Sequence, residues 1–424
     1  MAHIMKEQGR AWLQLVTRKS RAADGLGQDK WSAPVGGPGG QQTMNRFFAG
    51  IIDSTLREGE QAPGVTFSRR DRTTLVRDLV RLGVDEIELG IAAPANDHIP
   101  ALVNRARQDG GNRCRLGLWC RCRPEDIRFA ARCRPDVLSL SMPVSDLHIH
   151  QRLRRNRAWV AETVAASVRR ALDLGIPRVA VGLEDGSRAD TEFLLRVAAI
   201  ARAAGAFRVR LADTVGICSP ASLAGLVRRL RENVDIEIGV HCHNDFGMAT
   251  ANSIAALEAG AGSLDATVLG IGERAGNCRL EEVIGFLALQ RGCRRYRPEL
   301  LPGLCRRVAR AGGLTIAENH PLVGARLFTC ETGLHQHGLA VNPATYEPYD
   351  PGRVGAERKL LFGLKTGTRA VHLHLARQGI ELTGPQLRRL VSSVRALGRT
   401  VDEKQLLLLA GRQAKTPRKS PQPS

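Results

Sequence analysis

Short apolar runs rich in β-branched residues alternate with longer amphipathic stretches from about residue 50 to residue 270, and this alternation limits the possible folds most. Amphipathic stretches such as 72–82, 159–174, 190–204 and 220–232 separate the runs. Eight strand–helix units over about 245 residues are typical of a closed parallel (β/α)8 TIM barrel. A doubly wound sheet is the competing fold, although it more often has fewer strands. The eight candidate strands are 50–53, 86–90, 116–121, 137–142, 179–184, 209–213, 236–243 and 266–270.

The regions outside this pattern have a different composition. Residues 1–43 end in a Gly- and Pro-rich stretch, which predicts a disordered extension before a barrel domain of residues 44–295. From 296 to 410, helical segments surround a loop-like region, 331–351, and predict a smaller helical C-terminal subdomain with a catalytic loop. Residues 411–424 are rich in Pro, Lys and Arg and are expected to form a disordered basic tail.

Composition narrows the functional class. The 424 residues carry a formal charge of +20, but aromatic residues make up only 4% and no basic-aromatic stripe is present, so anionic small molecules fit better than nucleic acid. No apolar run approaches the length of a membrane span, and we expect a cytoplasmic protein. The ten cysteines contain no pair of CxxC motifs, which indicates reduced thiols rather than a structural zinc site.

A histidine pair closes the seventh candidate strand, in the sequence His241-Cys242-His243. Side chains alternate along a strand, so the two imidazoles share one face at the carboxyl end, where barrel active sites lie. Two imidazoles placed in this way can chelate one divalent ion. The competing interpretation is two histidines that only bond to their neighbours.

Two other strand ends carry polar clusters that could complete such a site. The first strand runs into Asp53–Gln61, where an acid beside an arginine can bind a metal while the guanidinium holds a substrate oxygen; the alternative is an ordinary solvated salt bridge. The eighth leads into Gly270–Asn277, whose glycine spacing does not match a dinucleotide fingerprint. We expect these glycines to allow close backbone approach, with the Asn277 oxygen turned to the metal.

Acid and base groups have two candidate sources. Glu184 ends the fifth strand, and His335 and Tyr346 lie in the later loop-like region. A single histidine or tyrosine in such a place is more often structural.

Taken together, the stretches DSTLREGEQAPGV, LADTVGICSP, HCHNDFGMATANSIAALEAGA and GIGERAGNCRLEEV resemble the DRE-TIM metallolyase family, in its acyl-CoA condensing branch. That branch contains homocitrate, isopropylmalate and citramalate synthases. The stretches SMPVSDLHI, VGLEDGSRAD, NDFGMATAN and ERAGN resemble the nitrogen-fixation type of homocitrate synthase. The resemblance therefore implies condensation of acetyl-CoA with a 2-keto dicarboxylic acid, 2-oxoglutarate, with a divalent metal (Mg, Mn or Zn) in a homodimer.

The resemblance also implies roles for single residues. Glu58, His241 and His243 match the metal ligands, with Asn277 close to the ion. Arg57 matches the arginine that polarises the keto oxygen, while Gln61 and Thr214 match residues that contact the keto acid. The acid–base group is matched by Glu184, His335 and Tyr346, of which the last two are expected to reach into a partner subunit's barrel.

This sequence departs from the family's pattern at two places. Lysine-pathway homocitrate synthases carry an arginine four positions before the glutamate that matches Glu184, and this chain has Ala180 there. Arg121 or His148 is therefore expected to bind the distal carboxylate of the keto acid instead. The usual Lys-His-Ser-Gly is replaced by Leu364–Gly367, which lacks the histidine.

The alternatives to homocitrate synthesis are isopropylmalate, citramalate or citrate synthesis, a related lyase, and a non-enzymatic binding protein.

Overall fold

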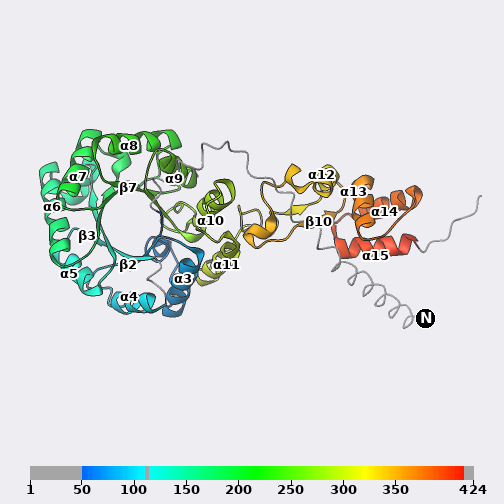
Figure 1. The fold of residues 1–424 in the computed structure, drawn as a ribbon, viewed down its shortest axis with the longest axis horizontal. Helices are drawn as coiled ribbons and strands as arrows, with labels where there is room; N and C mark the ends of the chain where they lie inside the picture. The colour runs from blue at the N-terminus through cyan, green and yellow to red at the C-terminus, as the bar shows by residue number, and fades with distance from the viewer. Residues whose placement is uncertain (1–49, 110–113, 415–424) are drawn as a thin grey trace, which may run out of the picture. The chain divides into compact units, whose positions relative to one another are not determined.

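The computed structural model describes residues 50–109 and 114–414, which divide into two compact units, 50–324 and 325–414. In the first, eight parallel strands close into a barrel in sequence order, with β8 paired to β1 (Figure 1). The expected TIM barrel is therefore confirmed. Its strands are β1 (Gly50–Asp53), β2 (Glu86–Ile91), β3 (Arg115–Arg121), β4 (Val137–Pro143), β5 (Val179–Glu184), β6 (Arg208–Asp213), β7 (Glu237–Cys242) and β8 (Ser263–Ala266).

Amphipathic helices surround these strands (Figure 1). Local sequence fixes their ends: Ser68 and Asp71 form a capping box at the start of α3, and Gly83 ends that helix in the left-handed conformation. The apolar helix faces pack against the strands in one continuous core. The helices of this unit are α3 (Arg69–Leu82), α4 (Ile99–Gln108), α5 (Pro124–Cys133), α6 (Arg157–Asp173), α7 (Thr191–Ala203), α8 (Pro220–Asn233), α9 (Ala249–Glu258), α10 (Leu280–Gly285) and α11 (Leu301–Ala311).

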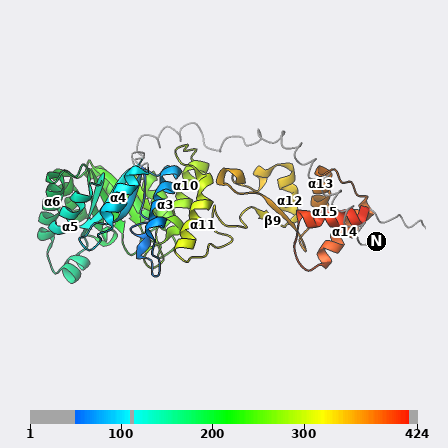
Figure 2. The same ribbon diagram turned by 90° about the horizontal axis from the view of Figure 1, so that it is seen from below.

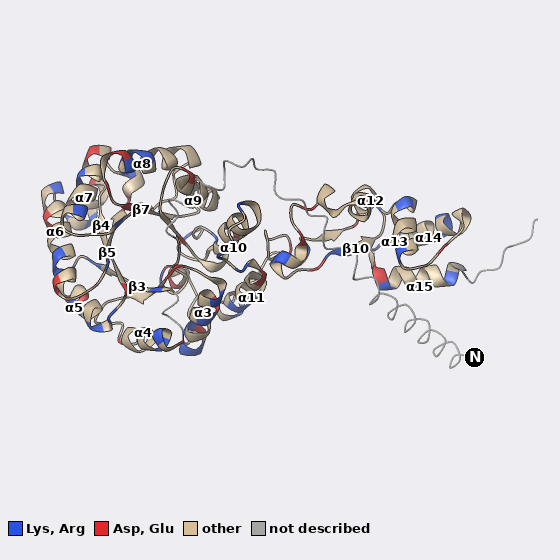
Figure 3. Ribbon diagram, in the orientation of Figure 1, with Lys and Arg blue, Asp and Glu red and all other residues tan. Residues whose placement is uncertain are grey.

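The barrel interior is charged rather than wholly apolar. Glu86 and Glu88 on β2, and Arg208 and Arg210 on β6, are all at most 5% exposed. Figure 3 shows acidic and basic positions on the strands as well as on the outer helices. Side chains alternate along a strand, so Glu86 and Glu88 lie on the same face of β2, and Arg208 and Arg210 lie on the same face of β6. These charges meet across the barrel, where Arg208 pairs with Glu86 and Arg210 pairs with Glu88.

The eighth strand differs from the expectation. It covers Ser263–Ala266 rather than 266–270. The apolar residues Val268 and Leu269 suggest a continuing strand, but Leu269 has a φ of 60° and Gly270 one of 64°, so the chain turns there. The polar loop after the strand thus begins earlier than the sequence pattern indicates.

Residues after 295 first continue the barrel unit. Helix α11 packs against α3 and against the turn that follows β8. The boundary between the two units therefore falls between residues 324 and 325, later than the expected boundary between residues 295 and 296.

The second unit, 325–414, combines helices with a small three-stranded sheet in the order β11-β10-β9. Figure 2 shows its helices together with strand β9. Phe362, Val371 and Leu390 belong to its separate apolar core. The elements are β9 (Thr329–Cys330), α12 (Gly333–Val341), β10 (Lys359–Phe362), α13 (Thr368–Arg377), α14 (Gly384–Ala396), β11 (Val401–Asp402) and α15 (Glu403–Ala414).

Two expectations for this part of the chain need correction. The region 331–351 is not a plain loop, because nine of its residues form α12 and the short turn Pro343–Thr345 follows. Residues 411–414, which were expected to belong to the tail, form the end of α15. The extension 1–43 and residues 415–424 lie outside the described residues.

All ten cysteines are free thiols. Among the described helices, none is long and apolar enough to cross a membrane.

Candidate metal and substrate site

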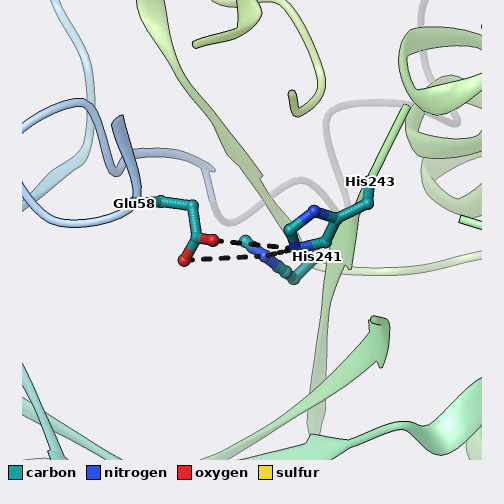
Figure 4. A group of neighbouring side chains, drawn as sticks. All are labelled: Glu58, His241 and His243. Atoms are coloured by element: carbon teal, nitrogen blue, oxygen red, sulfur yellow. Dashed lines mark hydrogen bonds and ion pairs between the residues drawn. The ribbon is translucent and has the colours of Figure 1, made fainter. Parts of the chain in front are cut away.

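Three buried side chains meet at the carboxyl end of the barrel. Glu58 follows β1, His241 lies on β7 and His243 stands just beyond the end of β7. The two imidazole Nε2 atoms are 3.1 Å apart, and the Glu58 carboxylate oxygens lie 3.7 Å from Nε2 of His243 and 4.0 Å from Nε2 of His241. Figure 4 shows the carboxylate and the two rings pointing toward one another. The structure therefore brings together the three residues expected to hold a metal.

The chemistry of these donors fits a divalent ion. Burial lowers the pKa of both histidines, that of His243 to about 2, so the rings are neutral and offer lone pairs. Nδ1 of His241 lies 2.9 Å from Asp265 Oδ2, which directs Nε2 toward the cluster. Two imidazoles and a carboxylate suit Mg²⁺, Mn²⁺ or Zn²⁺.

Asn277 stands beside this cluster, as expected. It pairs with His243 in an isolated antiparallel bridge, and its side-chain nitrogen donates to the Ile271 carbonyl at 3.0 Å. Its Oδ1 is buried without a described hydrogen-bond partner, which leaves this oxygen available to an ion. A Cβ at Gly272 would collide with the Asn277 amide, so the glycine permits the close approach that the sequence suggested.

Arg57 adds a buried guanidinium next to the cluster. It forms an ion pair with Glu58, and its Nε donates to Glu88 Oε2 at 2.8 Å. Its guanidinium also lies 5.7 Å from the centre of the Trp119 ring. Two carboxylates and an aromatic face therefore hold Arg57 at the cluster.

A network of buried charges supports this arrangement, and the sequence analysis missed it. Arg210 Nη1 donates to Glu88 Oε1 at 2.8 Å and to Asp265 Oδ2 at 2.7 Å. Glu88 therefore joins Arg210 to Arg57, and Asp265 joins it to His241. Burial raises the pKa of Glu88, but Arg210 and Arg57 outweigh that effect and lower it overall, so the carboxylate stays ionised. The alternating charges in Glu86–Ile91 and Arg208–Asp213 are the signal that could have revealed this network.

A cavity of about 540 Å³ opens above these groups. Most of the expected site residues of the barrel line it, whereas His148 and Asn277 are not among its lining residues. The expected residues that line it are Arg57, Glu58, Gln61, Arg121, Glu184, Thr214, His241 and His243.

Glu184 lies at the wall of this cavity and is held by a residue the sequence analysis did not single out. Arg152 reaches its two carboxylate oxygens at 2.6 and 3.0 Å, and Ser141 Oγ lies 3.3 Å away. Arg152 belongs to the π-helical turn His148–Leu153, a kind of turn that is frequent at functional sites. His148, at the start of that turn, has Nδ1 3.5 Å from Glu184.

Two of the residues expected to contact the substrate already form hydrogen bonds within the protein. Arg121 donates to the buried Asp126 from Nε at 2.7 Å and from Nη2 at 3.1 Å, so this edge of its guanidinium is already paired. Thr214 Oγ1 accepts from the Asp185 backbone N–H at 2.8 Å. Gln61 is exposed at the end of a short turn after Glu58.

His335 and Tyr346 belong to the second unit. His335 lies on α12, and Tyr346 follows the turn at Pro343–Thr345. Their rings stack with centroids 4.1 Å apart, and both side chains are exposed. The structure thus brings these two residues together with each other.

Comparison with known proteins shows where this architecture belongs. Residues 49–299 match the family model described as HMGL-like, and residues 322–402 match the one described as homocitrate synthase post-HMGL domain-like. This chain belongs to the HMGL-like family. It is a condensing enzyme of the acyltransferase type, with a second domain like that of homocitrate synthases.

Several curated relatives of this condensing enzyme are similar over most of their length. A homocitrate synthase of Methanopyrus kandleri is 41% identical, covering 82% of this chain and 87% of the relative. A homocitrate synthase of Nostoc is 38% identical over 83% and 92%. A 2-isopropylmalate synthase of Caldanaerobacter subterraneus is 36% identical over 85% and 94%, which is comparably close.

Solved structures agree on the fold alone. The HMG-CoA lyase of Bacillus subtilis superposes with a TM-score of 0.57 at 19% identity, covering 63% of this condensing enzyme and 95% of the lyase. The hydroxymethylglutaryl-CoA lyase of Pseudomonas aeruginosa gives 0.56 at 19% identity, over 63% and 94%.

Proposed function

We propose that this enzyme condenses acetyl-CoA with 2-oxoglutarate and water to give homocitrate and CoA. The observation that carries the proposal is the match of residues 322–402 to the homocitrate synthase type of second domain. In the same chain, the barrel brings together three side chains that could hold a metal ion. Relatives named as homocitrate synthases support it. Isopropylmalate and citramalate synthases, with comparably similar relatives, are the alternative.

Glu58, His241 and His243 are the proposed metal ligands, and Asn277 Oδ1, which has no described hydrogen-bond partner, is proposed to lie close to the ion. A divalent ion held there would supply a Lewis acid that polarises the keto group and orients the keto acid. Arg57 is placed to stabilise negative charge on the keto oxygen, because its guanidinium is buried beside the ligands. Gln61 and Thr214, on the wall of the same cavity, are proposed to contact the keto acid.

The condensation also requires a base and an acid. A base removes a proton from the acetyl-CoA methyl group, the resulting enolate carbon attacks the keto carbon, and the alkoxide is protonated. Water then cleaves the thioester and releases CoA. We assign the base to His335, alone or with Glu184, and place Tyr346 with them because its ring stacks on His335. His335 and Tyr346 are proposed to act at the barrel of a partner subunit in a homodimer.

The nature of the keto acid is the first test. We expect kcat/KM for 2-oxoglutarate to exceed that for 2-oxoisovalerate by at least about a hundredfold, because a site that pairs a distal carboxylate rejects an analogue that lacks it. CoA release with each keto acid can be followed with a thiol reagent. Faster turnover of 2-oxoisovalerate or pyruvate would contradict homocitrate synthesis and leave the condensation chemistry intact.

The base is tested by isotope exchange. We expect His335→Ala to bind 2-oxoglutarate but to exchange the methyl protons of acetyl-CoA into deuterated water at least about a hundredfold more slowly than the unmodified enzyme. His337→Ala, on the same helix, is the matched control and should exchange normally. Exchange at the unmodified rate in His335→Ala would place the base elsewhere.

The same variant tests whether the base acts in the partner's site. Mixing inactive His335→Ala with inactive Glu58→Ala should restore part of the activity in hybrid dimers. If verified subunit exchange restores none, the base acts within its own chain.

A further inference from the structure

A second buried arginine lines the cavity beside the cluster of Glu58, His241 and His243. Arg210 lies on β6, is 5% exposed and lines the cavity together with His241 and Glu184. It shares Asp265 with His241 and Glu88 with Arg57. A small molecule bound by one end at the proposed metal ligands would therefore have this guanidinium close to its other end.

The hydrogen bonds of Arg210 leave part of the guanidinium available. Nη1 donates to Glu88 and to Asp265, and Nη2 donates to Ser139 Oγ at 2.8 Å. A guanidinium has five N–H groups, so these three bonds leave two without a described acceptor. Two N–H groups are what a carboxylate needs for a bidentate contact.

The neighbouring strands leave space beside it. Arg210 pairs in register with Gly182 on β5, and Ala212 follows it on the same face of β6. A Cβ built at Gly182 would lie 3.5 Å from the Leu140 carbonyl oxygen and 3.8 Å from Ser141 Oγ, which are ordinary contacts, so this position can accept a methyl group. Ala180, on the same face of β5 as Gly182, is also small.

Two other arginines that line the cavity, Arg121 and Arg152, are less suited to this role. The Nε and Nη2 atoms of Arg121 are bonded to Asp126, and Arg152 spans both oxygens of Glu184. Arg208, two residues before Arg210, forms comparable ion pairs with Glu86 and Glu237 but is not among the residues that line the cavity. Both arginines pair with interior carboxylates, but only Arg210 also lines the cavity.

We propose that Arg210 binds the distal carboxylate of the keto acid and thereby selects a dicarboxylic substrate. This inference rests on the proposed function, and it replaces the expectation that Arg121 or His148 has this role. The remaining two N–H groups of Arg210 donate to the distal carboxylate while Glu88 and Asp265 hold the guanidinium in place.

The test compares two keto acids in two matched variants. In Arg210→Lys, which keeps the charge but not the planar donor edge, we expect the ratio of kcat/KM for 2-oxoglutarate to kcat/KM for 2-oxobutyrate to fall at least about thirtyfold, mainly through KM for 2-oxoglutarate. Arg208→Lys, the matched control, should leave the ratio of the two unchanged. Bound metal and the melting temperature are measured for each variant.

Gly182→Ala offers a second route that leaves every ion pair of Arg210 in place. Gly182 lines the cavity on the strand that pairs with Arg210, so the added methyl reduces the cavity space there, and KM for 2-oxoglutarate should rise at least about fivefold while that for pyruvate stays unchanged. This variant keeps the proposal testable if Arg210→Lys fails to fold.

The outcomes separate the two proposals. An unmodified enzyme that prefers 2-oxoglutarate, combined with an unchanged ratio in Arg210→Lys, overturns the role of Arg210 alone. Equal losses for both keto acids also overturn it, because they indicate a residue that only positions Arg57 and His241. An unmodified enzyme that prefers a monocarboxylic keto acid overturns the proposed function itself. If Arg210→Lys does not fold, unchanged kinetics in Gly182→Ala overturn the role of Arg210.

Discussion

Replacing His243 with alanine is expected to lower kcat by at least about three orders of magnitude and to reduce the bound divalent metal strongly. The reason is geometric: its Nε2 lies 3.1 Å from that of His241 and 3.7 Å from the Glu58 carboxylate, so its removal opens one side of the cluster. Elemental analysis of the purified variant, combined with steady-state kinetics, checks both parts of the prediction.

Cys242→Ala is the matched control for this variant. Cys242 precedes His243 directly, is buried on the opposite face of β7, and its thiol keeps its proton because burial raises its pKa well above the usual value. Its replacement should leave the metal content unchanged. Full metal occupancy in His243→Ala would exclude His243 as a ligand.

The second large effect is expected for Arg57→Lys, which should retain the metal but lose at least about two orders of magnitude in kcat. The guanidinium contacts Glu58 and Glu88 through different nitrogens, and a lysine ammonium cannot reproduce that planar arrangement beside a developing alkoxide. Steady-state kinetics on the metal-loaded variant measure the loss.

Arg77→Lys serves as the control for this substitution, since Arg77 pairs with Asp109 in the barrel's outer helical layer. It should have normal activity. A kcat within about threefold of normal in Arg57→Lys would remove Arg57 from the chemistry.

The cluster of Glu58, His241 and His243 was predictable because its geometry is largely local. The spacing of His241 and His243 on a strand fixes their common face, and the end of the first strand places Glu58 at the same rim. A closed barrel brings all strand ends together, so recognising the fold was enough to bring the three residues together. Asn277 followed from the glycines around it, which let the backbone approach closely.

The charged interior was not predicted, because sequence reasoning assigns strand interiors to apolar side chains. Glu88 and Arg210 are 122 positions apart, and only closure of the barrel makes them partners. The role expected for Arg121 depended on its place at a strand end, and the sequence did not reveal that Asp126 would pair with it. Pairing within the folded chain therefore sets which guanidinium nitrogens remain open to the cavity.

Local conformation explains the remaining differences. The end of β8 depends on positive φ values at Leu269 and Gly270, which an apolar run conceals. Helix α12 was expected as loop because glycines and histidines are frequent in it, although its segment buries Gln336 and Leu339 against the second unit. Backbone conformation at the end of β8, and side-chain burial in α12, outweigh the local composition.

The most direct test of the central claim is product analysis with the purified enzyme, acetyl-CoA and 2-oxoglutarate, before and after removal of divalent metal by chelation. The account predicts that mass spectrometry detects homocitrate in an amount equal to the CoA released, that chelation stops its formation, and that Mg²⁺, Mn²⁺ or Zn²⁺ restores it. Homocitrate formation at an undiminished rate by enzyme shown to be free of metal, or CoA release without homocitrate, would contradict the account.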